Sequence, residues 1–190
     1  MPATLTPVSL RLTPEEYFAW EATQEEKHDY AYGEVFPMSG ASRVHIEITQ
    51  NLMVALHLAF RGTDCRVYAS EMRTEIEAGG RYTYPDLCAV CGEPAFLGPK
   101  ETTLTNPTLV VEVLSDSTEA YDTTEKLAAY RAMPSVREIV LVRQDRRAAT
   151  AYRRGSDGRW TLEDVTTGAL ALESVGVEVT VDDLYAETGL

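Results

Sequence analysis

The sequence predicts an α/β (α+β) domain in which helices flank a mixed sheet. Short apolar runs rich in β-branched residues, at 108–114 and 138–142, have the pattern of strands buried on both faces. Segments with helical spacing of apolar residues lie at 45–60 and 119–131. A chain of 190 residues is most simply a single domain, and it is long enough to bury about 70% of its unfolded surface.

The first elements are predicted from capping and turn residues. Thr13 as the cap, Pro14 at the first helical position and acids in the first turn predict a short helix that ends at about Trp20. Aromatic residues on both sides of Gly33 predict a turn that enters a strand within 30–38.

The remaining elements follow from apolar spacing and turn signals. Before the strand at 108–114 we expect a long amphipathic helix at 45–60, two short strands or one bent strand at 65–68 and 72–76, and a strand at 82–90. After it we expect a helix at 119–131, a strand at 138–142, a hairpin of 149–153 with 160–165, an apolar segment at 175–181 and a terminal helical turn from 182.

One carboxylate interrupts the apolar strand at 108–114. An ionised Glu112 inside a core strand costs several kcal/mol unless a metal, a base or a proton compensates it. Asp122 and Lys126 are four residues apart on the following helix and therefore share a face. The pattern suggests a site. The alternative is that Glu112 lies at a solvated strand end and that Lys126 is an ordinary surface lysine.

A second carboxylate, Asp86, follows Pro85 in an otherwise apolar segment. Because proline cannot donate to a strand ladder, an edge, a strand start or a bulge is expected there. Two carboxylates about 5 Å apart repel by roughly 3 kcal/mol at an effective dielectric near 20, so Asp86 beside Glu112 would require a cation. Carboxylate oxygens suit Mg²⁺ or Mn²⁺, and such an ion with the Lys126 ammonium can support phosphodiester hydrolysis.

Charge and composition limit the partners. Seventeen basic against thirty acidic residues give a net charge of −13, which argues against tight nucleic-acid binding by counterion release. Arginines gather at 137–154 and acids at 163–187, so the local electrostatic fields of these runs could differ in sign, although solvated faces are the simpler interpretation of both. No apolar run is long enough to span a membrane, and residues 1–4 do not begin a signal peptide.

The cysteines and the single histidine at a helix start are weaker signals. Three cysteines, an odd number, agree with a reducing compartment, and we expect a cytoplasmic protein. Cys88 and Cys91 form a CxxC pattern, but on a strand they would point to opposite faces and lack a second pair, so no zinc site is expected. His45, in the first turn of its helix, would more often be structural than catalytic.

Several motifs in fixed order resemble the Uma family of putative restriction endonucleases, within the PD-(D/E)XK nuclease superfamily. The similarity covers about 12–183, nearly the whole chain. The residues that carry it are Tyr32-Gly33-Glu34, Met38-Ser39 with His45, Tyr84-Pro85-Asp86, Val111-Glu112-Val113-Leu114-Ser115, Asp122 with Lys126 and Tyr130, and Glu138-Ile139-Val140-Leu141-Val142.

The resemblance implies a restriction-endonuclease-like core with Mg²⁺ or Mn²⁺ at the motif acids. Asp86 matches the PD element and Glu112 the (D/E) position, and the ion is assigned to these two residues and to Val113 at the x position. Leu114 departs from the motif, because an apolar side chain cannot replace the lysine. Lys126 on the following helix is expected to stand in for it.

Two further residues match family positions whose roles are less defined. Glu34 and His45 correspond to an N-terminal acid and a histidine, each of which could be a metal ligand, a base or a scaffold hydrogen-bonder.

The expected function is that of a metal-dependent DNA endonuclease in which Lys126 orients or activates water. A two-fold homodimer would allow cutting of both strands. One alternative is a non-catalytic relative that acts as a binding or assembly module, favoured by the net charge of −13 and by Leu114. Another is a metal-dependent hydrolase of a small phosphorylated substrate, for which an acidic surface is less of an obstacle.

Overall fold

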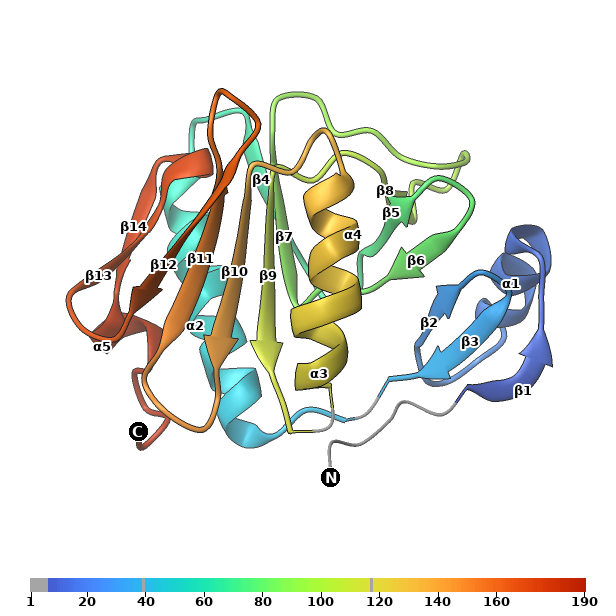
Figure 1. The fold of residues 1–190 in the computed structure, drawn as a ribbon, viewed down its shortest axis with the longest axis horizontal. Helices are drawn as coiled ribbons and strands as arrows, with labels where there is room; N and C mark the ends of the chain where they lie inside the picture. Colours follow the sequence, from blue (N-terminus) through green and yellow to red (C-terminus); the bar gives the residue numbers. More distant parts are fainter. Residues whose placement is uncertain (1–6, 39, 117) are drawn as a thin grey trace.

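The fold is described from a computed structural model that covers residues 7–38, 40–116 and 118–190. Residues 1–4, on which the absence of a signal-peptide pattern rests, lie outside the described residues, as do Ser39, one of the residues that carry the family resemblance, and Ser117. The described chain forms two six-stranded sheets and a separate two-stranded hairpin (Figure 1). The fold is thus mixed α/β, as predicted, with two large sheets instead of one.

The sheet that carries Glu112 has the strand order β12-β11-β10-β9-β7-β4. Its central strand β9 runs parallel to β10 and antiparallel to β7, and all of its residues are buried. The strands are β4 Cys65–Ala69, β7 Leu87–Cys91, β9 Leu109–Leu114, β10 Glu138–Arg143, β11 Ala149–Arg154 and β12 Trp160–Val165.

The second sheet combines N-terminal strands with short strands that precede β9 in the chain. Its order is β1-β3-β2-β6-β5-β8, and β2 joins the N-terminal hairpin to β6. The strands are β1 Val8–Arg11, β2 His28–Ala31, β3 Glu34–Pro37, β5 Arg73–Glu77, β6 Arg81–Thr83 and β8 Thr103–Leu104. A third, small sheet pairs β13 Ala169–Leu172 with β14 Val177–Thr180.

The helices that start at Pro14, Arg43 and Val181 each follow a residue whose side chain accepts a hydrogen bond from the first helical turn. α1 Pro14–Glu21 starts after Thr13, whose side chain and that of Glu16 form a capping box. The other helical segments are α2 Arg43–Ala59, α3 Glu119–Tyr121, the π-helical turn η1 Asp122–Lys126, α4 Leu127–Ala132, the 3-10 turn η2 Glu173–Val175 and α5 Val181–Leu184. None of the helices in the described ranges is long and apolar enough to cross a membrane.

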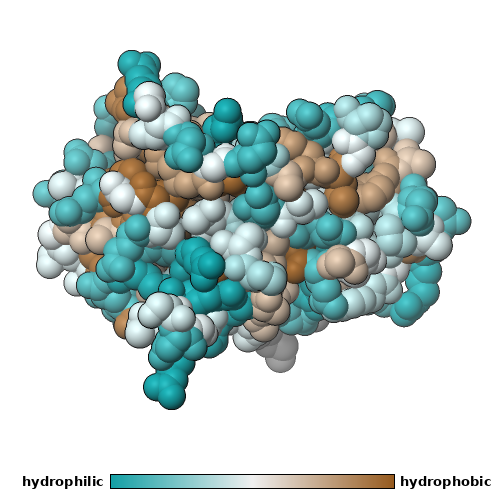
Figure 2. Space-filling model, turned by 90° about the horizontal axis from the view of Figure 1, so that it is seen from above, coloured by the Kyte–Doolittle hydropathy of each residue, from teal (hydrophilic) through white to brown (hydrophobic). Residues whose placement is uncertain are grey.

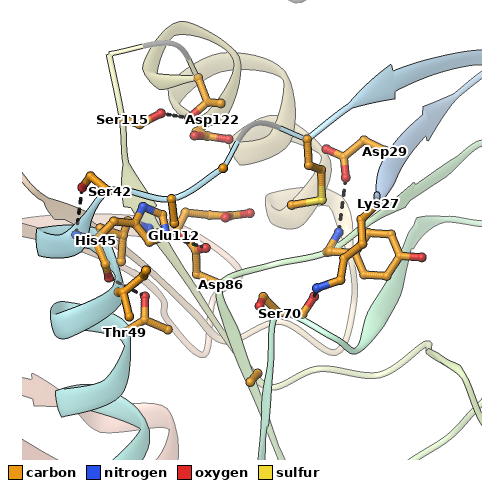
Figure 3. Close-up of a pocket in the computed structure, with 18 of the residues that line it drawn as sticks. Lys27, Asp29, Ser42, His45, Thr49, Ser70, Asp86, Glu112, Ser115 and Asp122 are labelled. Carbon is orange, nitrogen blue, oxygen red and sulfur yellow. Dashed lines mark hydrogen bonds and ion pairs between the residues drawn. The ribbon is translucent and has the colours of Figure 1, made fainter. Parts of the chain in front are cut away.

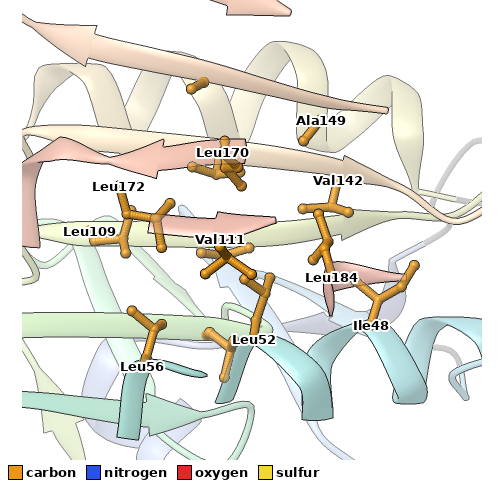
Figure 4. Packing of buried hydrophobic residues seen from close by; sticks show 14 of the residues in the cluster. Ile48, Leu52, Leu56, Leu109, Val111, Val142, Ala149, Leu170, Leu172 and Leu184 are labelled. Atoms are coloured by element: carbon orange, nitrogen blue, oxygen red, sulfur yellow. The ribbon is translucent and has the colours of Figure 1, made fainter. Parts of the chain in front are cut away.

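Alternating residues of β9 pack against helices on opposite faces of the central sheet. One face, with Leu109 and Val111, packs against Ile48, Leu52 and Leu56 of α2 (Figure 4). The other face packs against α4 through a second cluster that includes Val110, Leu114, Leu127, Tyr130 and Ile139. Because strand residues alternate between faces, Glu112 lies on the α4 face, between two apolar neighbours of its own strand.

Three predicted elements differ in the structure. The strand expected at 82–90 is two strands, β6 and β7, which belong to different sheets and are separated by Pro85 and Asp86. A proline cannot donate to a ladder, so the change of sheet occurs at Pro85. The helix expected at 119–131 contains a π-helical turn, and the segment expected at 175–181 is strand β14 followed by the start of α5.

The cysteines differ in state. Cys65 and Cys91, directly paired residues of β4 and β7, form a disulfide. Cys88 is a buried free thiol in a different cluster, so Cys88 and Cys91 do point to opposite faces as expected for strand residues. The odd number of cysteines therefore reflects one disulfide and one buried thiol, and the disulfide is at odds with the reducing compartment expected from that number.

The basic and acidic runs of the C-terminal half pair with each other in part. Arg153 contacts Glu138 at 2.8 Å and Glu163 at 2.5 Å, and Arg147 pairs with Asp182. Glu163 and Asp182 both belong to the acidic run at 163–187. These ion pairs partly cancel the opposite electrostatic fields of the arginine run and the acidic run.

Candidate active site

A pocket of about 960 Å³ opens where the two large sheets meet. Its walls come from the start of α2, the segment before β2, the residues around the start of β7, the end of β9 and the π-helical turn. Asp86, Glu112 and His45 line it (Figure 3). Lys126 lines it as well. Four residues from distant parts of the sequence therefore share one cavity.

Asp86 is held by two hydrogen bonds, one to each carboxylate oxygen. The main-chain N–H of Val113 donates to Oδ2 at 2.7 Å, and Nε2 of His45 lies 2.8 Å from Oδ1. His45 is fixed in turn by the helix start, where its N–H donates to Oγ of Ser42 at 3.1 Å. The helix start thus orients the histidine, and the histidine orients the aspartate.

The sheet register brings Asp86 next to Glu112. Leu87 of β7 pairs with Val111 of β9 at the end of this antiparallel ladder, and Asp86 comes directly before Leu87. Asp86 therefore lies just beyond the last paired residue, near Glu112, and its charge contributes to the raised pKa of Glu112.

Glu112 is 3% exposed and receives two hydrogen bonds at Oε1. The Tyr130 hydroxyl donates at 2.6 Å and Nζ of Lys126 at 3.3 Å. Burial raises the pKa of Glu112 to about 8, against the opposing effect of the Lys126 ammonium. The side chain is thus a desolvated carboxyl group whose ionised form needs more positive charge than Lys126 supplies.

Lys126 is surrounded by three carboxylates. Its Nζ lies 3.3 Å from Glu112, 3.4 Å from Asp122 and 3.5 Å from Asp29, and the residue is only 6% exposed. Burial by itself lowers the pKa of Lys126, but the three carboxylates outweigh burial and raise the pKa well above its usual value. The side chain is a permanent ammonium ion that cannot accept a proton from water.

The π-helical turn Asp122–Lys126 places Asp122 and Lys126, which form an ion pair, on one face of the helix. Hydroxyls of Thr123 and Thr124 donate to the carbonyl oxygens of Glu119 and Ala120, at 2.6 and 2.5 Å. Such bonds compete with main-chain helix bonding, and π-turns often occur at functional sites.

Asp29 is a site residue that the sequence analysis missed. It lies on β2, is 5% exposed, and reaches Lys126 from the second sheet. The Thr83 hydroxyl donates to its Oδ1 at 2.8 Å and the Tyr84 N–H donates to the same oxygen at 3.3 Å. Asp29 directly precedes the largely apolar segment 30–36, and an acid in that position was a weak sign of a functional residue. Nothing in the local sequence connected it with Lys126.

Glu34 is placed elsewhere. It lies on β3, pairs with Arg11 at 2.9 Å, and keeps 41% of its side chain exposed. It is absent from the described residues that line the pocket. The N-terminal acid that contacts Lys126 is Asp29 instead.

The available oxygen donors suit a hard divalent ion. Among the described residues no group of three or more His, Cys, Asp or Glu side chains is arranged to hold a metal. Mg²⁺ needs fewer protein ligands, because it is typically bound by one or two carboxylates and retains several waters or substrate oxygens. Two adjacent carboxylates, one buried with a raised pKa, fit that requirement.

The profile of the Uma2 family, described as "Putative restriction endonuclease", matches residues 14–182. The chain belongs to the Uma2 family. The match spans nearly all of the described fold and includes every residue of the pocket discussed above. Membership supports a nuclease-like function.

Related proteins align with this Uma2 protein over most of its length. An uncharacterized protein of Synechocystis sp. is 36% identical over 177 residues, covering 92% of each chain. A second uncharacterized Synechocystis protein is 33% identical over 154 residues, covering 81% of this chain and 87% of its own. The crystal structure of a putative nuclease belonging to DUF820, from Anabaena variabilis, has a TM-score of 0.73 at 17% identity and covers 92% of this chain and 97% of its own. That likeness establishes a shared nuclease-like fold.

The Uma2 chain lacks the lysine of the in-line motif for a structural reason. Leu114, at that position, is 6% exposed and packs in the cluster with Leu127 and Tyr130. Lys126 approaches Glu112 from the neighbouring helix. A positive charge therefore reaches the acid from α4's side of the sheet although the strand position is apolar.

Proposed function

We propose that this Uma2 protein is a divalent-metal-dependent endodeoxyribonuclease that hydrolyses phosphodiester bonds. The observation that carries the proposal is that Asp86 and Glu112 line one pocket close enough for the charge of Asp86 to raise the pKa of Glu112, with the buried Lys126 ammonium 3.3 Å from Glu112. Paired carboxylates and a fixed positive charge are the groups that metal-assisted phosphodiester hydrolysis requires.

In this proposal Asp86, Glu112 and Val113 hold Mg²⁺ or Mn²⁺. The ion would polarise the phosphate and lower the pKa of a bound water. The hydrogen bond from His45 keeps Asp86 in place, and the Tyr130 hydroxyl does the same for Glu112. These two residues act through the carboxylates that they hold.

Lys126 supplies charge and position in this scheme. Because its pKa is raised well above the usual value, it remains protonated and cannot act as a general base. It limits the repulsion among Asp29, Glu112 and Asp122 and keeps Glu112 directed into the pocket. Of the two roles predicted for Lys126, orientation is therefore favoured over activation of water by proton removal.

The test is calorimetric binding of Mn²⁺ and Mg²⁺, followed by cleavage of linear, circular and single-stranded DNA. Wild type should bind the ion, whereas Asp86→Asn and Glu112→Gln should lose binding and cleavage while remaining folded. Glu178→Gln, an exposed acid on β14, serves as the matched control and should behave like wild type. If wild type neither binds a divalent ion nor cuts any DNA form, the proposal is wrong and a non-catalytic binding module is the better description.

A second candidate is hydrolysis of a small phosphorylated substrate. The pocket walls include the exposed acids Glu25, Glu26, Glu71 and Asp116, which oppose the approach of a long polyanion. A small phosphate ester carries less charge and needs less space. Cleavage of such an ester by wild type, with all DNA forms left intact, would favour this candidate. A homodimer and a cytoplasmic location stay predictions.

A further inference from the structure

The pocket contains a second lysine, Lys27, which the catalytic proposal does not use. Among the described residues that line the pocket, only Lys27 and Lys126 are lysine or arginine. Lys126 already contacts three carboxylates within 3.5 Å and is 6% exposed. An anionic substrate therefore meets one cation in this pocket that is available for a direct contact, and that cation is Lys27.

The position of Lys27 is fixed by its main chain and its stem. Its carbonyl oxygen accepts a hydrogen bond from the N–H of Met38 at 2.9 Å, and its Nζ lies 5.8 Å from the centre of the Tyr84 ring. Successive residues of an extended strand point to opposite faces, so Lys27 and Asp29 share the pocket side while His28 turns away to Glu21. The close-up view has Lys27 and His45 on opposite sides of Asp86 (Figure 3).

The present partners of Lys27 can be exchanged. Nζ donates to the carbonyl oxygen of Ser70 at 3.1 Å and forms an ion pair with Glu71. The side chain of Glu71 is 83% exposed and that of Lys27 is 30% exposed. Because exposed ion pairs contribute little, a substrate phosphate can replace Glu71 at low energetic cost.

We propose that Lys27 is a substrate-binding residue that contacts a phosphate of the bound DNA strand, and that Glu71 competes with that phosphate for Lys27. The inference rests on the proposed nuclease function for the identity of the ligand. In this inference Lys27 contributes to the affinity for DNA and takes no part in bond cleavage. It also gives Glu71 an antagonistic role, which a purely structural ion pair would not have.

The test measures binding of a short fluorescent single-stranded DNA oligonucleotide by anisotropy over a series of salt concentrations. Ca²⁺ is present as a hard, oxygen-binding cation, and gels check that the oligonucleotide remains intact. Lys27→Met should weaken binding about tenfold, as expected for one charged hydrogen bond. The slope of log affinity against log salt should fall by about 0.7, as expected for one lost phosphate contact on a single strand.

Three further variants separate this role from a structural one. Lys27→Arg keeps the charge and should retain the salt slope, while Glu71→Gln removes the competitor and should tighten binding. Lys100→Met, an exposed lysine outside the pocket, is the matched control and should leave binding unchanged. Circular dichroism and melting temperature check that each variant is folded.

The outcomes distinguish this inference from the proposed function. Binding that depends on Lys27 without any cleavage supports the inference and counts against the nuclease. Cleavage by wild type with unchanged affinity and salt slope in Lys27→Met overturns the inference and leaves the nuclease standing. Failure of wild type to bind the oligonucleotide overturns the inference as well.

Discussion

Replacing Lys126 by methionine is expected to destabilise the protein strongly, because three buried carboxylates lose their shared cation. At distances of 3.3–3.5 Å and an effective dielectric of 20, each ammonium–carboxylate attraction is about 5 kcal/mol. Much of this attraction offsets the desolvation of the four charges. Removing one partner of a buried ion pair typically costs about 3–5 kcal/mol net, and we expect a loss in that range.

The assay is urea and thermal unfolding of Lys126→Met beside wild type and Lys100→Met, the exposed lysine used as control. For a domain of this size, about 3–5 kcal/mol corresponds to a fall in melting temperature of roughly 6–20 °C. The double variant Lys126→Met with Glu112→Gln should recover part of the loss, since one of the uncompensated charges is removed.

The loss should also depend on pH in a defined direction. Burial raises the pKa of Glu112 to about 8 in the folded protein, above its unfolded value, so folding favours the protonated form. This contribution is fully present below the unfolded pKa and is lost as pH rises through about 8. Without Lys126, which lowers the pKa of Glu112, the folded pKa rises further. The part of the loss that depends on Glu112 should therefore be absent well below pH 8 and should grow as the pH rises above about 8, where Glu112 ionises in the folded wild type but stays protonated in the folded variant. A loss below about 1 kcal/mol at every pH would refute the assignment of Lys126 as the counter-ion of the site.

Three other predictions concern regions outside the pocket. Glu138→Ala should lower the free energy of unfolding, measured in urea, by about 3–5 kcal/mol, because Glu138 is fully buried and Arg153 would lose its contact at 2.8 Å. A loss no larger than that caused by replacing an exposed acid would contradict the importance of this pair. Burial raises the pKa of the Cys88 thiol to about 12, so a thiol reagent at pH 8 should label it only after unfolding, and rapid labelling of the native protein would show that the thiol is accessible. Reduction of the Cys65–Cys91 disulfide, which spans a sequence separation of 26, should lower stability by about 3–4 kcal/mol in the chain-entropy model, and Cys65→Ser should then be insensitive to reductant.

The nuclease proposal and the acidic character of the protein are compatible only if cations mediate the encounter with DNA. The sequence carries a net charge of −13, and hydrophilic residues alternate with scattered apolar ones over the face seen from above in Figure 2. A divalent ion at Asp86 and Glu112 and the ammonium of Lys27 would supply positive charge where the phosphate has to lie. Binding at low ionic strength without a divalent ion should therefore be weaker than binding with one.

Sequence alone determined the central strand with Glu112 and singled out Asp86 as a second acid. The β-branched run at 109–114 could form only a buried strand, so Glu112 was recognisable as a costly charge before its surroundings were known. Pro85 marked a point where strand pairing had to change, and Asp86 next to it became a candidate for the same reason. The spacing of Asp122 and Lys126 predicted that they share a face, and the structure pairs them there. These features depend on local periodicity and on residue chemistry, which a sequence displays directly.

Only the tertiary structure decided which distant groups complete the site. Asp29 comes from a different sheet to reach Lys126, while Glu34, five positions further along, faces Arg11. Their separation depends on the hairpin register of β2 and β3, because a shift of one residue turns every side chain to the opposite face. The disulfide between Cys65 and Cys91 was likewise set by the pairing of β4 with β7. Such contacts arise from how sheets assemble, and no local pattern in the sequence contains that information.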